Sequence, residues 1–189
     1  MNDSRLRKVA GLVSAGALSV AIVAGCSSST PSGDGGSSSG SGSSGCTESN
    51  YKDKAPDLAG CDLKDADLSG AKVNGVDLSG ANLDDANMSK VSAQNADLSG
   101  ANGAGSNMSG ADLQKANLSN ADLKGADLSG ADLTDAKIAD ANLSGANLSN
   151  ADLTGADISG TNLKGADYAD TTCPDGSKTS SDENPCKAS

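Results

Sequence analysis

The sequence contains no Trp, Phe or His, and its only aromatic residues are Tyr51 and Tyr168. Without large rings the chain cannot build a globular core of ordinary bulk, because such rings dominate the buried area of most cores. Without His it lacks the commonest general base and metal ligand. Outside a Gly/Ser-rich stretch, no Ser lies in a Gly-x-Ser-x-Gly motif, and no phosphate-binding loop is present. We therefore predict no enzyme, no catalytic residue, no cofactor and no metal.

Arginine is confined to Arg5 and Arg7. The rest of the chain therefore lacks the side chain that grips phosphate in a bidentate manner. The chain has 14 basic and 25 acidic residues. Removing residues 1–25 takes away three basic residues and one acidic residue, which leaves a net charge of −13. This composition predicts that nucleic acid is not a partner.

Residues 1–25 have the organisation of an export signal. Arg5, Arg7 and Lys8 precede the uncharged stretch 9–25, which is short for a membrane span. The following Val23-Ala24-Gly25-Cys26 resembles the lipobox of bacterial lipoproteins. The resemblance implies lipid attachment to Cys26, cleavage before it, and anchoring at the extracytoplasmic face of the bacterial cell membrane. An ordinary secretory peptide or an uncleaved anchor is the alternative.

The next segment is a spacer in composition. Residues 27–45 read SSSTPSGDGGSSSGSGSSG and contain nothing apolar to bury. Together with Cys26 they form a predicted flexible linker, 26–45, with a reach of roughly 25 Å.

A five-residue pattern, Ala-Asp/Asn-Leu-X-X, fills residues 56–170. Its central positions fall at every fifth residue from Leu58 to Tyr168, which makes 23 repeats. With a period of five, the apolar residues would scatter around a helix and alternate between the two faces of a straight strand. We therefore expect the chain to turn in every repeat. The Ala and the centre then point inward. The last position, mostly Gly, Asn or Asp, suits the corner.

The repeat resembles the pentapeptide-repeat family, whose motif is A(D/N)LXX. The resemblance implies an all-β fold, a right-handed quadrilateral β-helix with four repeats in each twenty-residue coil. The 23 repeats then give a little under six coils. Low aromatic content and acidity also suit a disordered chain, but the unbroken phase of the repeat argues against disorder.

The exceptions at the centres cluster in one coil. Ala93 and Gly103 replace large residues, and Met88 and Met108 occupy the column between them. We interpret the methionines as gap-fillers, since Met adapts to irregular space. A small pocket or a bend near residues 88–110 is the alternative.

Four cysteines remain after Cys26, and an even count in an exported chain predicts two disulfides. In the solenoid that the family resemblance implies, a Cys61–Cys173 bond would join residues 112 positions apart, too far for a disulfide. Pairing each tail with the far end would require both tails to run the length of the solenoid, so we expect the local pairs Cys46–Cys61 and Cys173–Cys186. These bonds would fasten an N-terminal cap, 46–55, and a C-terminal cap and tail, 171–189. A redox or metal role is the alternative.

The outward positions form files along the expected coils. Asp112, Asp132 and Asp152 would stand about 4.8 Å apart, so we expect raised pKa values or attraction of cations. Asparagine pairs that could form side-chain ladders are Asn82/Asn102, Asn142/Asn162 and Asn87/Asn107. A serine file follows the third column, at Ser69, Ser89, Ser109, Ser129 and Ser149. Simple repetition of a soluble motif explains the same files without any function.

Together these features predict a membrane-anchored, extracytoplasmic structural or protein-interaction module, attached through Cys26 and serving an unidentified protein partner. The alternative comes from the family, since some pentapeptide-repeat proteins are acidic DNA mimics that bind gyrase and give quinolone resistance. The export signal and the disulfides disfavour that alternative, because gyrase is cytoplasmic.

Overall fold

The structure is a computed structural model that describes residues 57–179 and Cys186. The predicted signal segment 1–25, the linker 26–45, the N-terminal cap 46–55 and the residues Cys26 and Cys46 lie outside this range. No helix in the described part of the chain is long and apolar enough to cross a membrane.

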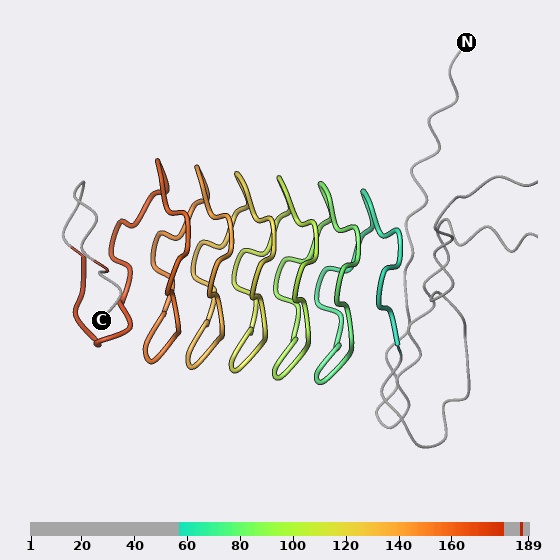
Figure 1. Cartoon of the computed structure of the whole chain (residues 1–189), viewed down its shortest axis with the longest axis horizontal. Helices are drawn as coiled ribbons and strands as arrows, with labels where there is room; N and C mark the ends of the chain where they lie inside the picture. The colour runs from blue at the N-terminus through green and yellow to red at the C-terminus, as the bar shows by residue number, and fades with distance from the viewer. Residues whose placement is uncertain (1–56, 180–185, 187–189) are drawn as a thin grey trace, which may run out of the picture.

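The described chain is a stack of coils that repeat every twenty residues (Figure 1). Single-residue parallel bridges join each bridged position to the one twenty residues later, from Asp57↔Asp77 to Asp152↔Thr172. Within residues 57–179 and 186 there is no helix and no longer strand, only these bridges separated by turns. Four repeats therefore complete one coil, as the resemblance implies.

Each coil has four corners, one in every repeat. The corner is closed by a hydrogen bond from the N–H three residues after the centre to the carbonyl of the centre, as from Ala121 to Leu118 (3.1 Å). The second residue after the centre has positive φ in every repeat from Gly60 to Asp170. This is the backbone sign that a type II turn requires there. Lys90 and Lys115 also adopt it (φ 56° and 57°), which the expected preference for Gly, Asn and Asp does not anticipate.

Through the middle of the stack, three backbone hydrogen bonds in each repeat join neighbouring coils. Around Leu118 they run from Leu118 N to Lys137 O (2.6 Å), from Asn120 N to Ala139 O (3.0 Å) and from Asn117 N to Ala96 O (2.9 Å). The centre and the Ala two residues before it are buried through most of the stack, as predicted, and fill the interior from all four sides. Near the ends they are only partly buried, at Leu58, Ala66, Ala71, Leu163, Ala166 and Tyr168.

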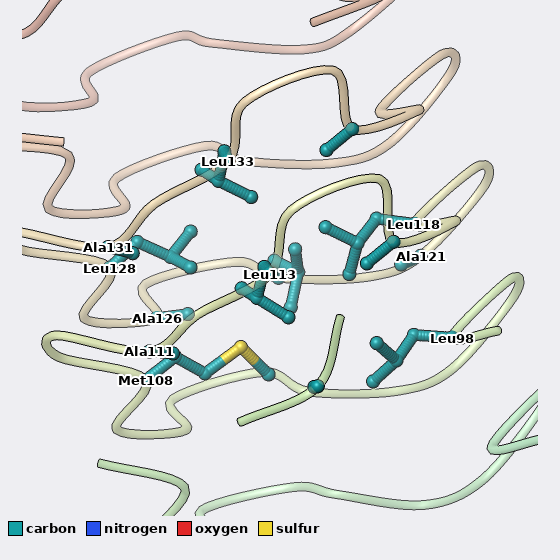
Figure 2. Close-up of a cluster of buried hydrophobic side chains, with 14 of the residues drawn as sticks. Leu98, Met108, Ala111, Leu113, Leu118, Ala121, Ala126, Leu128, Ala131 and Leu133 are labelled. Carbon is teal, nitrogen blue, oxygen red and sulfur yellow. The ribbon is translucent and has the colours of Figure 1, made fainter. Parts of the chain in front are cut away.

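The coil with the small centres remains filled. A Cβ placed on Gly103 would lie 2.9 Å from Leu123 Cδ2, 3.3 Å from Ser106 Oγ and 3.4 Å from Met108 Cε. Figure 2 shows Met108 extending across the interior toward the wall that carries Leu98. Neighbouring side chains thus occupy the space beside Gly103, which supports the interpretation of Met108 as a gap-filler.

The C-terminal end is fastened by a disulfide between Cys173 and Cys186. This is the local pair expected there, and it excludes a Cys61–Cys173 bond. Cys61 is also disulfide-bonded. Its expected partner, Cys46, lies outside the described residues, so that pair stays a prediction.

Candidate interaction surface

The Asp or Asn before each centre forms part of the backbone's hydrogen bonding. Its Oδ1 accepts the N–H of the residue just after the centre, as in Asp77 with Ser79 (2.9 Å) and Asn117 with Ser119 (3.2 Å). The bonds between coils leave this N–H open, and a buried or half-buried N–H without a partner is costly. Short Asx side chains are suited to such local bonds. The repeated Asp and Asn therefore stabilise the turns that follow them.

Two of the three predicted asparagine ladders are present. Asn102 Nδ2 donates to Asn82 Oδ1 (3.2 Å), and Asn162 Nδ2 donates to Asn142 Oδ1 (3.0 Å). The third prediction is wrong. Asn87 donates to Asp67 (3.1 Å), on the opposite side from Asn107.

In the acidic file Asp112, Asp132 and Asp152, the prediction of a raised pKa fails at the middle residue, Asp132. Gln94 Nε2 donates to Asp112 Oδ2 and Gln114 Nε2 to Asp132 Oδ2, both at 2.7 Å. Partial burial disfavours the charge on Asp132, but hydrogen bonds from Thr134 and Gln114 outweigh it, so the pKa of Asp132 is lowered. The expected rise is therefore wrong for Asp132, because hydrogen bonds from Thr134 and Gln114 stabilise its charged form.

Sequence reasoning missed a second acidic file, at Asp57, Asp77 and Asp97. These residues bridge one another along the first column of repeats. The Ser99 hydroxyl, aided by the Ser99 amide and by Asn117, lowers the pKa of Asp97 against the effect of partial burial. The twenty-residue spacing alone would have revealed this file.

Two hydroxyls of the serine file donate hydrogen bonds to asparagine side chains on the same face. Ser109 Oγ donates to Asn107 Oδ1 and Ser149 Oγ to Asn147 Oδ1, both at 2.7 Å. These hydroxyls extend the local Asx turns. Among residues 57–179 and 186, no three His, Cys, Asp or Glu side chains converge in a way that could hold a metal ion.

Two of the predicted site residues, Cys26 and Cys46, lie outside the described range. The other three, Cys61, Cys173 and Cys186, are buried at the two ends of the described stack. What the described faces offer is a regular, hydrogen-bonded polar surface. Such a surface suits contact with another molecule better than it suits chemistry.

The model of pentapeptide repeats matches residues 61–100, 94–130 and 131–167, with eight copies. No curated protein matches the sequence. Among solved structures, the chain is similar to the pentapeptide-repeat protein Rfr23 from the cyanobacterium Cyanothece 51142, with 32% identity and a TM-score of 0.41. That match covers 55% of this chain and 62% of Rfr23, so this chain spans about three-fifths of that protein's length.

Two further structures are similar. The pentapeptide-repeat protein alr5209 from Nostoc PCC 7120 is 37% identical over 59% of this chain and 83% of its own, with a TM-score of 0.32. QnrB1, a plasmid-mediated fluoroquinolone resistance protein, is 17% identical over 59% of this chain and 72% of its own, with a TM-score of 0.38. The family model covers more than half of the sequence. The chain belongs to the pentapeptide-repeat family.

Proposed function

We propose that the protein is a membrane-anchored, extracytoplasmic structural or protein-interaction module without catalysis. Pentapeptide-repeat proteins are generally structural or interaction modules, and family membership implies a right-handed quadrilateral β-helix. The observation that carries the anchoring is the order of three segments: a basic and apolar N-terminus ending in Val23-Ala24-Gly25-Cys26, a Gly/Ser linker, and a stack of coils.

The proposed arrangement is a rod on a tether. A little under six coils at about 4.8 Å each make a rod of about 28 Å. The linker adds a reach of about 25 Å between the lipid and the first coil. The rod therefore presents its four polar faces away from the lipid surface, where a protein partner can meet them.

The anchor is tested by feeding cells a radioactive fatty acid and isolating the protein. We expect label in the wild type and none in the variant Cys26→Ala, which lacks the acceptor sulfur. Cys61→Ala serves as a matched control, because it removes a cysteine but leaves the lipobox intact. An unlabelled wild type would refute the anchoring.

The partner is sought by crosslinking in intact cells that carry the anchored protein, followed by mass spectrometry. A module of this kind should give the same extracytoplasmic protein repeatedly. The same capture with Cys26→Ala should lose it if anchoring brings the two together. Recovery of cytoplasmic proteins alone would contradict the proposed location.

The alternative function, binding to gyrase, is suggested by the acidity of the rod. The hydrogen bonds of the Asx turns weaken that argument, because they give the carboxylates a structural role. Asp side chains close Asx turns in twelve of the 23 repeats, so these local turns account for much of the acidity without a DNA-like surface. A supercoiling assay with the purified protein separates the two functions. Unchanged gyrase activity is the outcome that we expect.

A further inference from the structure

One face of the stack departs repeatedly from the five-residue motif. It consists of three rows on successive coils, residues 70–75, 90–95 and 110–115. Lys72 and Ser92 stand before the centres, where the motif has Asp or Asn, and a parallel bridge joins them. Gln94 and Gln114, the only glutamines in the chain, follow the centres of the second and third rows. These unusual residues therefore lie side by side.

Two corners of this face hold strained lysines. Lys90 and Lys115 have positive φ (56° and 57°), whereas every other corner of this kind in residues 57–179 is Gly, Asn or Asp. A long side chain in the left-handed region costs backbone strain that glycine would avoid. Positions that keep such strain and break a local rule cluster at functional sites. The two corners therefore indicate that the lysine side chains have a use outside the fold.

The same face is positively charged, although the rod is acidic. Its three rows carry three lysines and one aspartate, a net charge of +2, whereas residues 57–179 as a whole carry 8 Lys and 19 Asp. Lys72, Lys90 and Lys115 are exposed, and no ion pair within the described part of the chain holds them. Lys90 leans over the next coil, since its Cγ lies 3.6 Å from the position of a Cβ on Gly110. The three ammonium groups therefore attract carboxylates from outside the chain.

Amide groups between the lysines are half used by the fold. Asn74 Oδ1 accepts hydrogen bonds from Ser92 Oγ (2.9 Å) and Gln94 N (2.8 Å), which leaves its Nδ2. Gln94 and Gln114 each donate through Nε2 to a carboxylate one coil later, which leaves their Oε1 atoms. Within residues 57–179 and 186 no hydrogen bond uses these three atoms, and no buried side-chain polar atom lacks a partner, so both Oε1 atoms reach solvent. A free amide N–H beside free amide oxygens can bond both polar groups of a peptide backbone.

We infer that this lysine–glutamine patch binds an acidic peptide segment of the protein partner. The patch is formed by Lys72, Asn74, Lys90, Gln94, Gln114 and Lys115. The lysines take the carboxylates of the segment, and the free amide groups take its backbone N–H and C=O. The patch spans two coil spacings, about 10 Å, so it holds a segment a few residues long and binds it weakly. The inference rests on the proposed function, which requires a protein partner.

Selective ¹⁵N labelling of glutamine tests the patch directly, because Gln94 and Gln114 are the only glutamines in the chain. The purified full-length chain is titrated with a capped peptide of alternating Glu and Ala, and separately with the same peptide carrying Gln in place of Glu. We expect the side-chain amide signals of both glutamines to shift with the acidic peptide and to stay in place with the neutral one. The shift at a given peptide concentration should shrink as salt is added, because salt screens exposed charges.

Substitution of the corner lysines separates binding from folding. Lys90→Gly and Lys115→Gly should each weaken the binding of the acidic peptide about two- to fivefold, the size expected for one exposed ion pair. Both variants relieve the left-handed backbone, so weaker binding cannot come from a destabilised fold. Lys124→Gly is the matched control, since it removes an exposed lysine that lies outside the patch, and it should bind the peptide as the wild type does.

Any of three results would overturn the inference. The first is glutamine signals that stay in place at millimolar acidic peptide, and the second is an equal shift with the neutral peptide. The third is an equal loss of binding in Lys124→Gly, which would show that net charge alone attracts the peptide. These measurements need no membrane, so the patch can fail while the fatty-acid label on Cys26 and the crosslinked partner still support the proposed function.

Discussion

Residues 86–110 and residues 111–155 share one backbone but enclose different cores. Both segments keep the same bridges, corners and hydrogen bonds between coils. In 111–155 every centre is Leu or Ile, whereas in 86–110 the centres are Met88, Ala93, Leu98, Gly103 and Met108. The comparison shows that the bridges, corners and hydrogen bonds between coils, here called the backbone frame, set the geometry of a coil. The side chains of the interior can vary as long as they fill the space.

The substitution with the largest expected effect lies in residues 111–155, the regular segment. Leu133→Ala should destabilise the chain by about 3 kcal/mol, because it opens a cavity at a buried centre whose neighbours are already closely packed. In the other segment, Met108→Leu keeps the volume and should cost less than about 1.5 kcal/mol. Urea denaturation followed by circular dichroism measures both variants. Equal costs would show that the two cores do not differ in tolerance.

The next prediction asks whether the space beside Gly103 is filled. Gly103→Leu should destabilise by about 2 kcal/mol, since its side chain would overlap Leu123 and Met108. Combining it with Met108→Ala should recover much of the loss, because one side chain then replaces the other. Chemical denaturation of the single and double variants gives the coupling. Stabilisation by Gly103→Leu alone would reveal an empty pocket and break the comparison.

Replacing corner glycines in residues 111–155 should cost different amounts of stability, depending on which side chain of the preceding coil lies beside the glycine. Gly155→Ala and Gly130→Ala both place a Cβ at positive φ, which costs about 1 kcal/mol. At Gly155 the new Cβ would also lie 2.5 Å from Asp135 Oδ1, whereas at Gly130 nothing lies within 4 Å. Moving Asp135 off its rotamer should add about 1 kcal/mol. Thermal unfolding of the two variants, with Gly155→Ala also made on Asp135→Ala, isolates this contact.

Two lysines at corner positions, Lys90 and Lys115, test whether the backbone of the corners is the same in both segments. Lys90→Gly and Lys115→Gly should each stabilise the chain by about 0.5–1 kcal/mol, because glycine relieves the left-handed backbone at some cost in chain entropy. The gain should be equal, although Lys90 belongs to one segment and Lys115 to the other. Lys124→Gly, at a position without positive φ, is the control and should not stabilise. Unequal gains would show that the core alters the corners.

The smallest effect concerns pH. The Ser159 hydroxyl and amide lower the pKa of Asp157, and Ser177 does the same for Asp175. A carboxyl with a lowered folded pKa contributes stability above its unfolded pKa of about 3.9, and that stability is lost as the pH falls through the folded value. Ser159→Ala should raise the pKa of Asp157 toward its ordinary value. Carbon-detected NMR titration measures the shift, and an unchanged pKa would contradict the assigned cause.

Much of the frame could be predicted from the sequence because the repeat never loses phase. The inward positions and the corner at the second residue after the centre agree with the structure, and so does the twenty-residue coil, which the family resemblance implied. The roles of polar side chains could not be predicted in the same way. The pKa of Asp132 depends on Gln114, eighteen residues before it, and a residue-by-residue reading does not place that amide beside the carboxylate.

By itself the sequence determined the five-residue period, the apolar stripe and the positions of the corners, since these follow from local chemistry repeated without a slip. Only the tertiary structure decided how Met108, Leu123 and Ser106 share the space beside Gly103, and which side chains donate hydrogen bonds to Asp112 and Asp132. It also decided how the described chain ends, in an antiparallel bridge between Thr172 and Lys178 beside the Cys173–Cys186 disulfide. The reason is that stacking brings together residues about twenty positions apart, and their side chains choose partners only when the coils meet.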